Sequence, residues 1–116
     1  MTTQATNTIV ARLIVSKPNS AGHMTQVGTV SFDASNRATL ATDGSGPAAE
    51  ELKNAWQEMS SRKTLTWVHS QPATRPDGRT VTEIVGDEVA PGDGQYLYAV
   101  LDTLNRKYGY TVEMAK

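Results

Sequence analysis

Residues 86 to 100, GDEVAPGDGQYLYAV, contain the densest run of acidic and glycine residues in the chain. Asp87, Glu88 and Asp93 could supply the carboxylate oxygens that Ca²⁺ and Mg²⁺ bind. Their spacing does not fit a D-x-[DN]-x-[DN]-G loop, and PGDGQ lacks the lysine of a P-loop and the three-glycine pattern of a dinucleotide site. We therefore expect no cofactor and a loop that begins a helix, with Asp93 as its N-cap; Asp87, Glu88 and Asp93 remain candidate metal ligands.

The two histidines are the other residues with catalytic potential. His69 follows Trp67 by two residues, so a strand would place it on the face that packs under the helices, as a partly buried histidine. Glu83 or Glu88 could orient it and form a general acid/base pair, which makes His69 and Glu83 the candidate catalytic residues. The chain contains no GxSxG or HExxH motif, and His23 is expected to be a solvated loop residue.

Aromatic residues offer a different function, which is contact with another protein. Helical spacing places Tyr108 in the apolar stripe of the last helix, and it places Tyr96 and Tyr98 on the two flanks, half exposed. Tyrosine is enriched where proteins meet. Tyr96 and Tyr98 are therefore the predicted partner-binding residues, and Trp56, on the edge of the first helix, is a further candidate.

Alternation of apolar and polar residues predicts the strands that would position these side chains. Turn-forming residues separate the alternating segments, with glycine, proline and asparagine at the positions where the chain must reverse. The predicted strands cover 8–17, 24–32 and 37–42, then two runs on either side of the turn RPDGR, and finally 110–114.

Apolar residues at three- and four-residue steps predict two helices. The first covers 47–63, with Ser45 or Gly46 as its cap and proline in its first turn. Glu50 and Glu51 lie near the positive end of its dipole, and these two glutamates and Glu58 are expected on the solvent side. The second covers 97–108 and is expected to stop at Gly109.

The predicted order is βββαββαβ in one α+β domain over 8–116, preceded by a flexible tail over 1–7. We expect two layers, a mixed or antiparallel sheet of about six strands with both helices on one face and a polar second face. If each helix crosses back over that sheet, the helices are antiparallel. The basic pairs Arg62-Lys63 and Arg106-Lys107 would then lie at opposite ends.

Composition limits the classes of function. A chain of 116 residues is long enough for one core and too short for a separate cofactor domain. With 11 basic and 12 acidic residues the net charge is -1, which does not favour a nucleic acid or an anionic membrane as the partner.

The chain contains no cysteine, which excludes a disulfide, a thiol nucleophile and a thiolate zinc site. It therefore needs no oxidising compartment, and a reducing cytoplasm suits it. No segment approaches the roughly 18 consecutive apolar residues of a membrane-spanning helix. The first residues, MTTQATN, lack the features of a secretory signal. The expectation is a soluble cytoplasmic protein.

These observations favour a small non-enzymatic protein-binding module, such as an inhibitor, an immunity protein or a regulatory adaptor of the kind that phages and mobile elements encode. A small enzyme using His69 with a nearby carboxylate is one alternative. Another is a homo-oligomer subunit whose first or last strand pairs across a two-fold axis. Nucleic-acid binding would require four arginines to gather on the open sheet face, namely Arg12, Arg37, Arg75 and Arg79.

Overall fold

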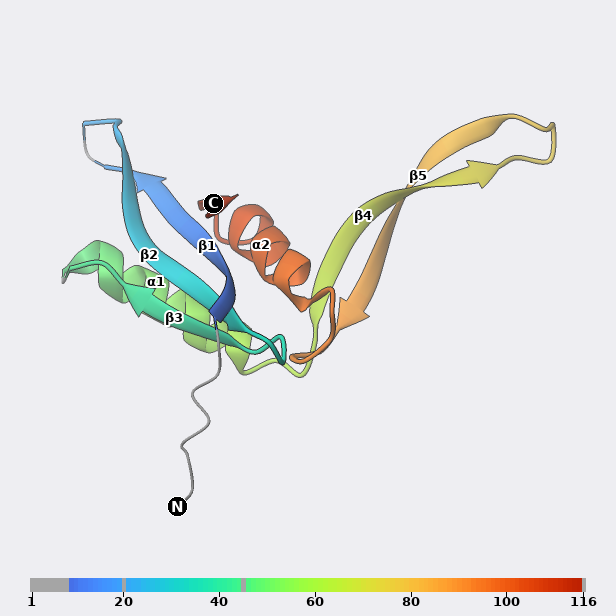
Figure 1. Ribbon diagram of the computed structural model, residues 1–116. Coiled ribbons are helices and arrows are strands. Elements are labelled where there is room, and N and C mark those ends of the chain that lie inside the picture. The colour runs from blue at the N-terminus through green and yellow to red at the C-terminus, as the bar shows by residue number, and fades with distance from the viewer. Residues whose placement is uncertain (1–8, 20, 45, 116) are drawn as a thin grey trace, which may run out of the picture.

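The computed structural model describes residues 9–19, 21–44 and 46–115, so the predicted tail over 1–7 and the predicted cap Ser45 lie outside the described residues. Six strands and two helices follow in the predicted order βββαββαβ, which confirms the α+β class (Figure 1). The elements are β1 (Ile9–Pro18), β2 (Met24–Asp33), β3 (Ala38–Thr42), α1 (Pro47–Ser60), β4 (Leu65–Thr74), β5 (Thr80–Val89), α2 (Tyr96–Arg106) and β6 (Thr111–Met114).

The strands form two antiparallel sheets where a single sheet was expected. Four strands pair in the order β3-β2-β1-β6, and β4 pairs with β5 alone. β1 is interior because β2 and β6 occupy both of its sides, so the first strand is not an edge, and β3 and β6 are the edges of this sheet. β4 and β5 leave the body as a two-stranded ribbon, which Figure 1 shows projecting away from the four-stranded sheet.

One face of the four-stranded sheet packs under both helices. Leu13 of β1 lies directly opposite Val30 of β2, and both side chains are fully buried. The helices bury Leu52 and Leu104 in the same core. The opposite face carries alternate residues such as Arg12, Ser31 and Thr39, paired across the strands, and neither helix covers it. The predicted polar second face is therefore present.

The end of α1 and the N-cap of α2 differ from the prediction. α1 begins with Pro47 in its first turn, as expected, but ends at Ser60, before the basic pair. The N-cap of α2 is Gln95, so the prediction of Asp93 as a cap is wrong. Asp93 instead closes the preceding loop, where its Oδ2 accepts the N–H of Ala90 at 2.9 Å.

α2 ends at Arg106, two residues before its predicted end, and Gly109 turns the chain away from the helix as expected. Gly109 adopts a left-handed φ of 76°, which residues other than glycine adopt at a cost. Its N–H donates to the carbonyl of Asn105, and the N–H of Tyr110 donates to the carbonyl of Leu104. These bonds satisfy carbonyls that the helix end leaves free and turn the chain into β6. Neither described helix has the length and apolar character needed to cross a membrane.

The ribbon pairs all ten residues of each strand, from Leu65 opposite Val89 at its base to Thr74 opposite Thr80 at its tip. Only the base is buried, because Leu65 and Val89 are the core residues that β4 and β5 contribute. An isolated two-stranded ribbon is marginally stable in water. The stability of the ribbon therefore depends on its contacts with α2 and on pairing with any further strand.

The four arginines proposed for a nucleic-acid surface do not share one sheet face. Arg12 lies in β1 and Arg37 precedes β3, in the body. Arg75 and Arg79 flank the turn at the tip of the ribbon, where the N–H of Arg75 donates to the carbonyl of Arg79. Because the arginines belong to two separate sheets, the structure does not form the basic patch that this alternative required.

Candidate functional site

Three aromatic rings stack at the base of the ribbon, where β4 meets the first turn of α2. Trp67 and His69 project from the same face of β4, and their ring centroids are 4.0 Å apart at an interplanar angle of 23°. The ring of Tyr98, from α2, stacks on Trp67 at 5.8 Å and 27°. Tyr98 is 50% exposed. We refer to Trp67, His69 and Tyr98 as the aromatic cluster.

A carboxylate orients the histidine of this cluster. Nε2 of His69 lies 2.6 Å from Oδ2 of Asp87, which is on the adjacent strand, diagonally across from His69. The carboxylate at His69 is therefore Asp87, and the prediction of Glu83 or Glu88 is wrong. Within the described residues, His69 has no hydrogen bond to a hydroxyl that could act as a nucleophile. The pair can move a proton, but the contacts provide no group for it to activate.

The candidate metal ligands are not brought together. Asp87 contacts His69, whereas Glu88 accepts hydrogen bonds from the hydroxyls of Thr64 and Thr66 on the other face of the ribbon. Asp93 lies in the loop that follows β5. Among the residues that the structure describes, no group of three potential ligands could hold a metal ion.

A carboxylate of α2 fixes the ribbon to the body. Oδ2 of Asp102 accepts the backbone N–H of Val68 at 2.8 Å. The N–H of Val68 therefore points away from β5, toward the helix. A pocket of about 210 Å³ lies beside this contact, lined among others by Arg62, Arg106 and Lys107. Asp102 and Glu88 also line it, so charges of both signs face the pocket.

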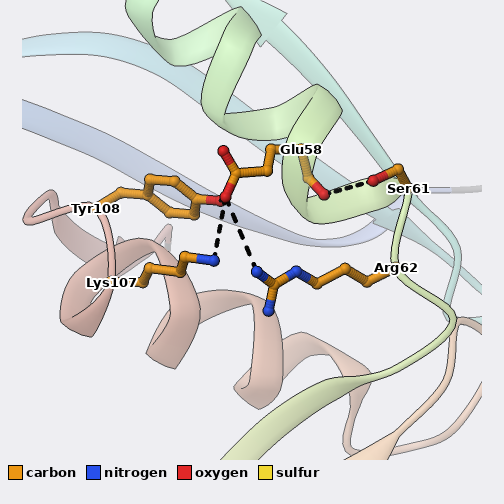
Figure 2. Close-up of polar contacts among 5 residues, drawn as sticks. All are labelled: Glu58, Ser61, Arg62, Lys107 and Tyr108. Carbon is orange, nitrogen blue, oxygen red and sulfur yellow. Dashed lines mark hydrogen bonds and ion pairs between the residues drawn. The ribbon is translucent and has the colours of Figure 1, made fainter.

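The two basic pairs converge, in contrast to the prediction that they lie at opposite ends. Figure 2 shows Lys107 and Arg62 reaching the same carboxylate, that of Glu58 on α1. Oε1 of Glu58 lies 3.1 Å from Nζ of Lys107 and 3.9 Å from the guanidinium of Arg62. The prediction is wrong because it assumed that α2 returns over a continuous sheet, and the ribbon interrupts that sheet.

Tyr108 completes this contact between the helices, since its hydroxyl donates to Oε1 of Glu58 at 2.9 Å (Figure 2). The hydrogen bond from Lys107, followed by that from Tyr108, lowers the pKa of Glu58. Partial burial, together with the bond to Glu58, raises the pKa of Tyr108. These contacts of Glu58 link the end of α1 to the end of α2, and we interpret them as structural.

Comparison with known proteins finds no relative. No protein-family model, curated protein or solved structure matches the chain. The assignment of function therefore depends on the contacts described above.

The predicted partner-binding residues have different environments. Tyr98 is exposed, but Tyr96 is only 4% exposed and its ring meets Phe32 edge-on, with the centroids 6.5 Å apart. Burial also raises the pKa of Tyr96. Trp56 is partly buried and packs against the core. The expectation that Tyr96 lies on a half-exposed flank is wrong, and Trp67, which was not predicted as a contact residue, supports Tyr98.

Glu58→Gln is expected to remove part of the acid sensitivity of the fold. Because the folded-state pKa of Glu58 is lowered, its contribution to stability is complete above the ordinary value of 4.5. The contribution is lost as pH falls through the lower folded-state pKa. The difference in Tm between the wild type and Glu58→Gln should therefore be largest near neutral pH and should narrow below pH 4.5.

Thermal unfolding followed by circular dichroism over this pH range measures the effect. The control is Glu113→Gln, an exposed glutamate of β6 with no ion pair within the described residues. A Tm difference for Glu58→Gln that stays constant on acidification would show that the contact with Lys107 and Tyr108 does not depend on the charge of Glu58.

Proposed function

We propose that the chain is a small non-enzymatic protein-binding module and that its partner binds at the aromatic cluster. The observation that carries this proposal is the half-exposed ring of Tyr98 stacked on Trp67. A large ring that neighbouring rings already restrain offers contact area at a small cost in conformational entropy, which is typical of interface hot spots.

Restraint of the cluster supports the proposal further. Trp67 lies between the rings of His69 and Tyr98, and Asp87 fixes the imidazole from the neighbouring strand. The bond from Val68 to Asp102 links the strand to the helix one residue away from Trp67. A binding surface that is ordered before the partner arrives loses less entropy on association.

The short contact between His69 and Asp87 is also what an enzyme would use, and it is the observation that favours the enzymatic alternative. Binding is favoured because the imidazole is stacked against Trp67 and, within the described residues, makes no hydrogen bond to a hydroxyl that could act as a nucleophile. In the proposed function His69 supports the position of Trp67. The small size of the chain fits an inhibitor, an immunity protein or a regulatory adaptor, and the absence of cysteine supports a role in the cytoplasm.

Tyr98→Ala is expected to weaken partner binding by roughly tenfold or more, since truncation of a hot-spot aromatic typically costs that much. The matched control is Met24→Ala, because Met24 at the start of β2 is 55% exposed and lies outside the cluster. The wild type and both variants are immobilised, exposed to lysate of the source cells, and compared by quantitative mass spectrometry.

The expected result is a protein that the wild type and Met24→Ala retain and that Tyr98→Ala loses, while circular dichroism shows all three folded. A protein retained equally by all three would place the binding surface elsewhere. Retention of no protein by the wild type would contradict the proposed function.

A further inference from the structure

The ribbon has two outer edges, and only one of them is protected against pairing with another strand. On the outer edge of β4, the N–H of Val68 is bonded to Asp102 of α2. Further along the same edge, Pro72 has no N–H to donate. In Figure 1, α2 lies on the β4 side of the ribbon base, and β5 lies on the side away from it.

The direction of the Val68 N–H identifies the groups on the other edge. In an antiparallel pair, residues directly opposite each other either exchange both hydrogen bonds or point both sets of backbone groups outward. Val68 points outward, so its partner Gly86 does as well. Alternation along β5 then directs outward the backbone groups of Thr80, Thr82, Ile84, Gly86 and Glu88. In the described parts of the chain no backbone group accepts from their N–H groups across that edge.

The β5 edge lacks several devices that normally prevent edge pairing, although it carries the carboxylates of Glu83, Asp87 and Glu88. Thr80–Val89 contains no proline and no lysine, and its pairing with β4 shows no bulge. At its centre, Ile84 is 70% exposed, the largest exposed fraction among the large hydrophobic residues that the structure describes. A ribbon that protects one edge and leaves the other open, with an apolar side chain in the middle, is suited to accept a strand there.

We propose that β5 pairs with β5 of a second copy of the chain, antiparallel across a two-fold axis at Ile84, to form a four-stranded sheet. Such a sheet exceeds the two strands that are only marginally stable in water. The proposal goes beyond the proposed function, because Tyr98 does not take part in the pairing.

Charge disfavours the two registers adjacent to the one with its axis at Ile84. Outward groups can meet only outward groups, so the axis must pass through a residue of β5 and not between two residues. An axis at Glu83 would place Glu83 opposite its own copy, and an axis at Val85 would place Glu83 opposite Asp87 twice. Like charges directly opposite each other are destabilising. An axis at Gly86 avoids this repulsion but shortens the ladder and pairs two glycines at its centre.

With the axis at Ile84, the carboxylates of β5 face uncharged residues. Glu83 lies opposite Val85 of the second copy, Asp87 opposite Val81, and Glu88 opposite Thr80. The two Ile84 side chains meet on the same face of the sheet and cover each other. The ladder extends from Thr80 to Glu88, and each outward pair exchanges both of its hydrogen bonds. Charge and apolar contact therefore agree on one arrangement.

A proline at Thr82 tests the edge without breaking the ribbon. The N–H of Thr82 points away from β4, so Thr82→Pro removes a bond between copies and none within the chain. Each dimer loses this bond twice, and the dissociation constant should rise roughly tenfold or more. Thr74→Pro is the matched control, because Thr74 points outward on the β4 edge. Its dissociation constant should equal that of the wild type.

Sedimentation equilibrium over a concentration series measures all three proteins. The expected result is a reversible dimer for the wild type and Thr74→Pro and a largely monomeric Thr82→Pro. A wild type that stays monomeric at its highest soluble concentration overturns the proposal and indicates that β5 either binds a strand of another protein or stays free. A dimer that Thr82→Pro does not weaken also overturns it, because the contact then lies elsewhere.

Single cysteines test the register, since the chain has none of its own. Under oxidation Ile84→Cys should form a disulfide-linked dimer, because Cα atoms of such a pair are about 5.5 Å apart, within disulfide range. Thr82→Cys and Gly86→Cys should not crosslink alone but should crosslink when mixed. Crosslinking of Thr82→Cys with itself, or none for Ile84→Cys, overturns the axis at Ile84.

Discussion

Phe32→Ala should lower the free energy of unfolding by about 3–5 kcal/mol, the usual cost of truncating a buried phenylalanine. Phe32 is 1% exposed, and its ring meets the ring of Tyr96 edge-on at 6.5 Å. Phe32 lies in β2, directly opposite Ala38 and Ala11, whose side chains are too small to fill the space that the ring would leave. The substitution therefore creates a cavity between the sheet and the start of α2.

Urea denaturation followed by circular dichroism measures this loss. Val10→Ala in β1 is the control, because Val10 is 60% exposed and its truncation should change the free energy by about 0.5 kcal/mol or less. Domains of this kind are stable by about 5–15 kcal/mol, so Phe32→Ala removes a large share. A loss below about 1 kcal/mol would contradict the contact between Phe32 and α2.

The order and type of the elements were predictable because each depends on periodicity within one short segment. The division into two sheets was not. Alternation along 65–74 and 80–89 shows that these segments are strands, but it does not show which strands lie beside them. The ribbon buries only Leu65 and Val89, at its base. The sequence pattern of its exposed outer part is the same as that of the polar face of an ordinary sheet.

The candidate site was only partly predictable, for reasons that differ between residues. Tyr96 and Tyr98 are two positions apart on a helix, so their side chains point in different directions, and tertiary packing decided that Tyr96 meets Phe32. The partner of His69 depended on the register of the hairpin, which places Asp87 diagonally across from it. Register is fixed by the turn and by contacts at the base, not by composition.

In the proposed dimer both copies of the aromatic cluster lie on one face of the four-stranded sheet. A two-fold axis through Ile84 is perpendicular to the ribbon, because the two copies of Ile84 lie on the same face of the sheet. The two copies of the aromatic cluster would then also lie on one face, opposite the face of Ile84, since Trp67 and Ile84 alternate across the paired strands. A dimer could therefore contact a partner with repeated sites at two points, which increases the apparent affinity.

Gly28→Val should also destabilise the fold strongly, by about 2–3 kcal/mol, through overpacking. Gly28 is buried in β2, next to the register shift at Val15 and Ser16, where α1 approaches the sheet. A Cβ atom at Gly28 would lie 2.6 Å from Cδ2 of Leu52 and 3.0 Å from the backbone oxygen of Ala41. Neither neighbour can move freely, because Leu52 is fully buried and the oxygen belongs to β3.

Gly86→Val is the control, because it places valine in a strand without the contact that an added Cβ at Gly28 makes with Leu52. Gly86 lies in β5, is exposed, and an added Cβ would meet only the methyl group of Thr66, at 3.2 Å. Its urea midpoint should stay close to that of the wild type, or rise slightly because valine favours strands. If both variants lost the same stability, the cause would be the replacement of glycine by valine in a strand and not the contact with α1. A loss confined to Gly28→Val would show that α1 packs on the sheet at a distance that only glycine permits.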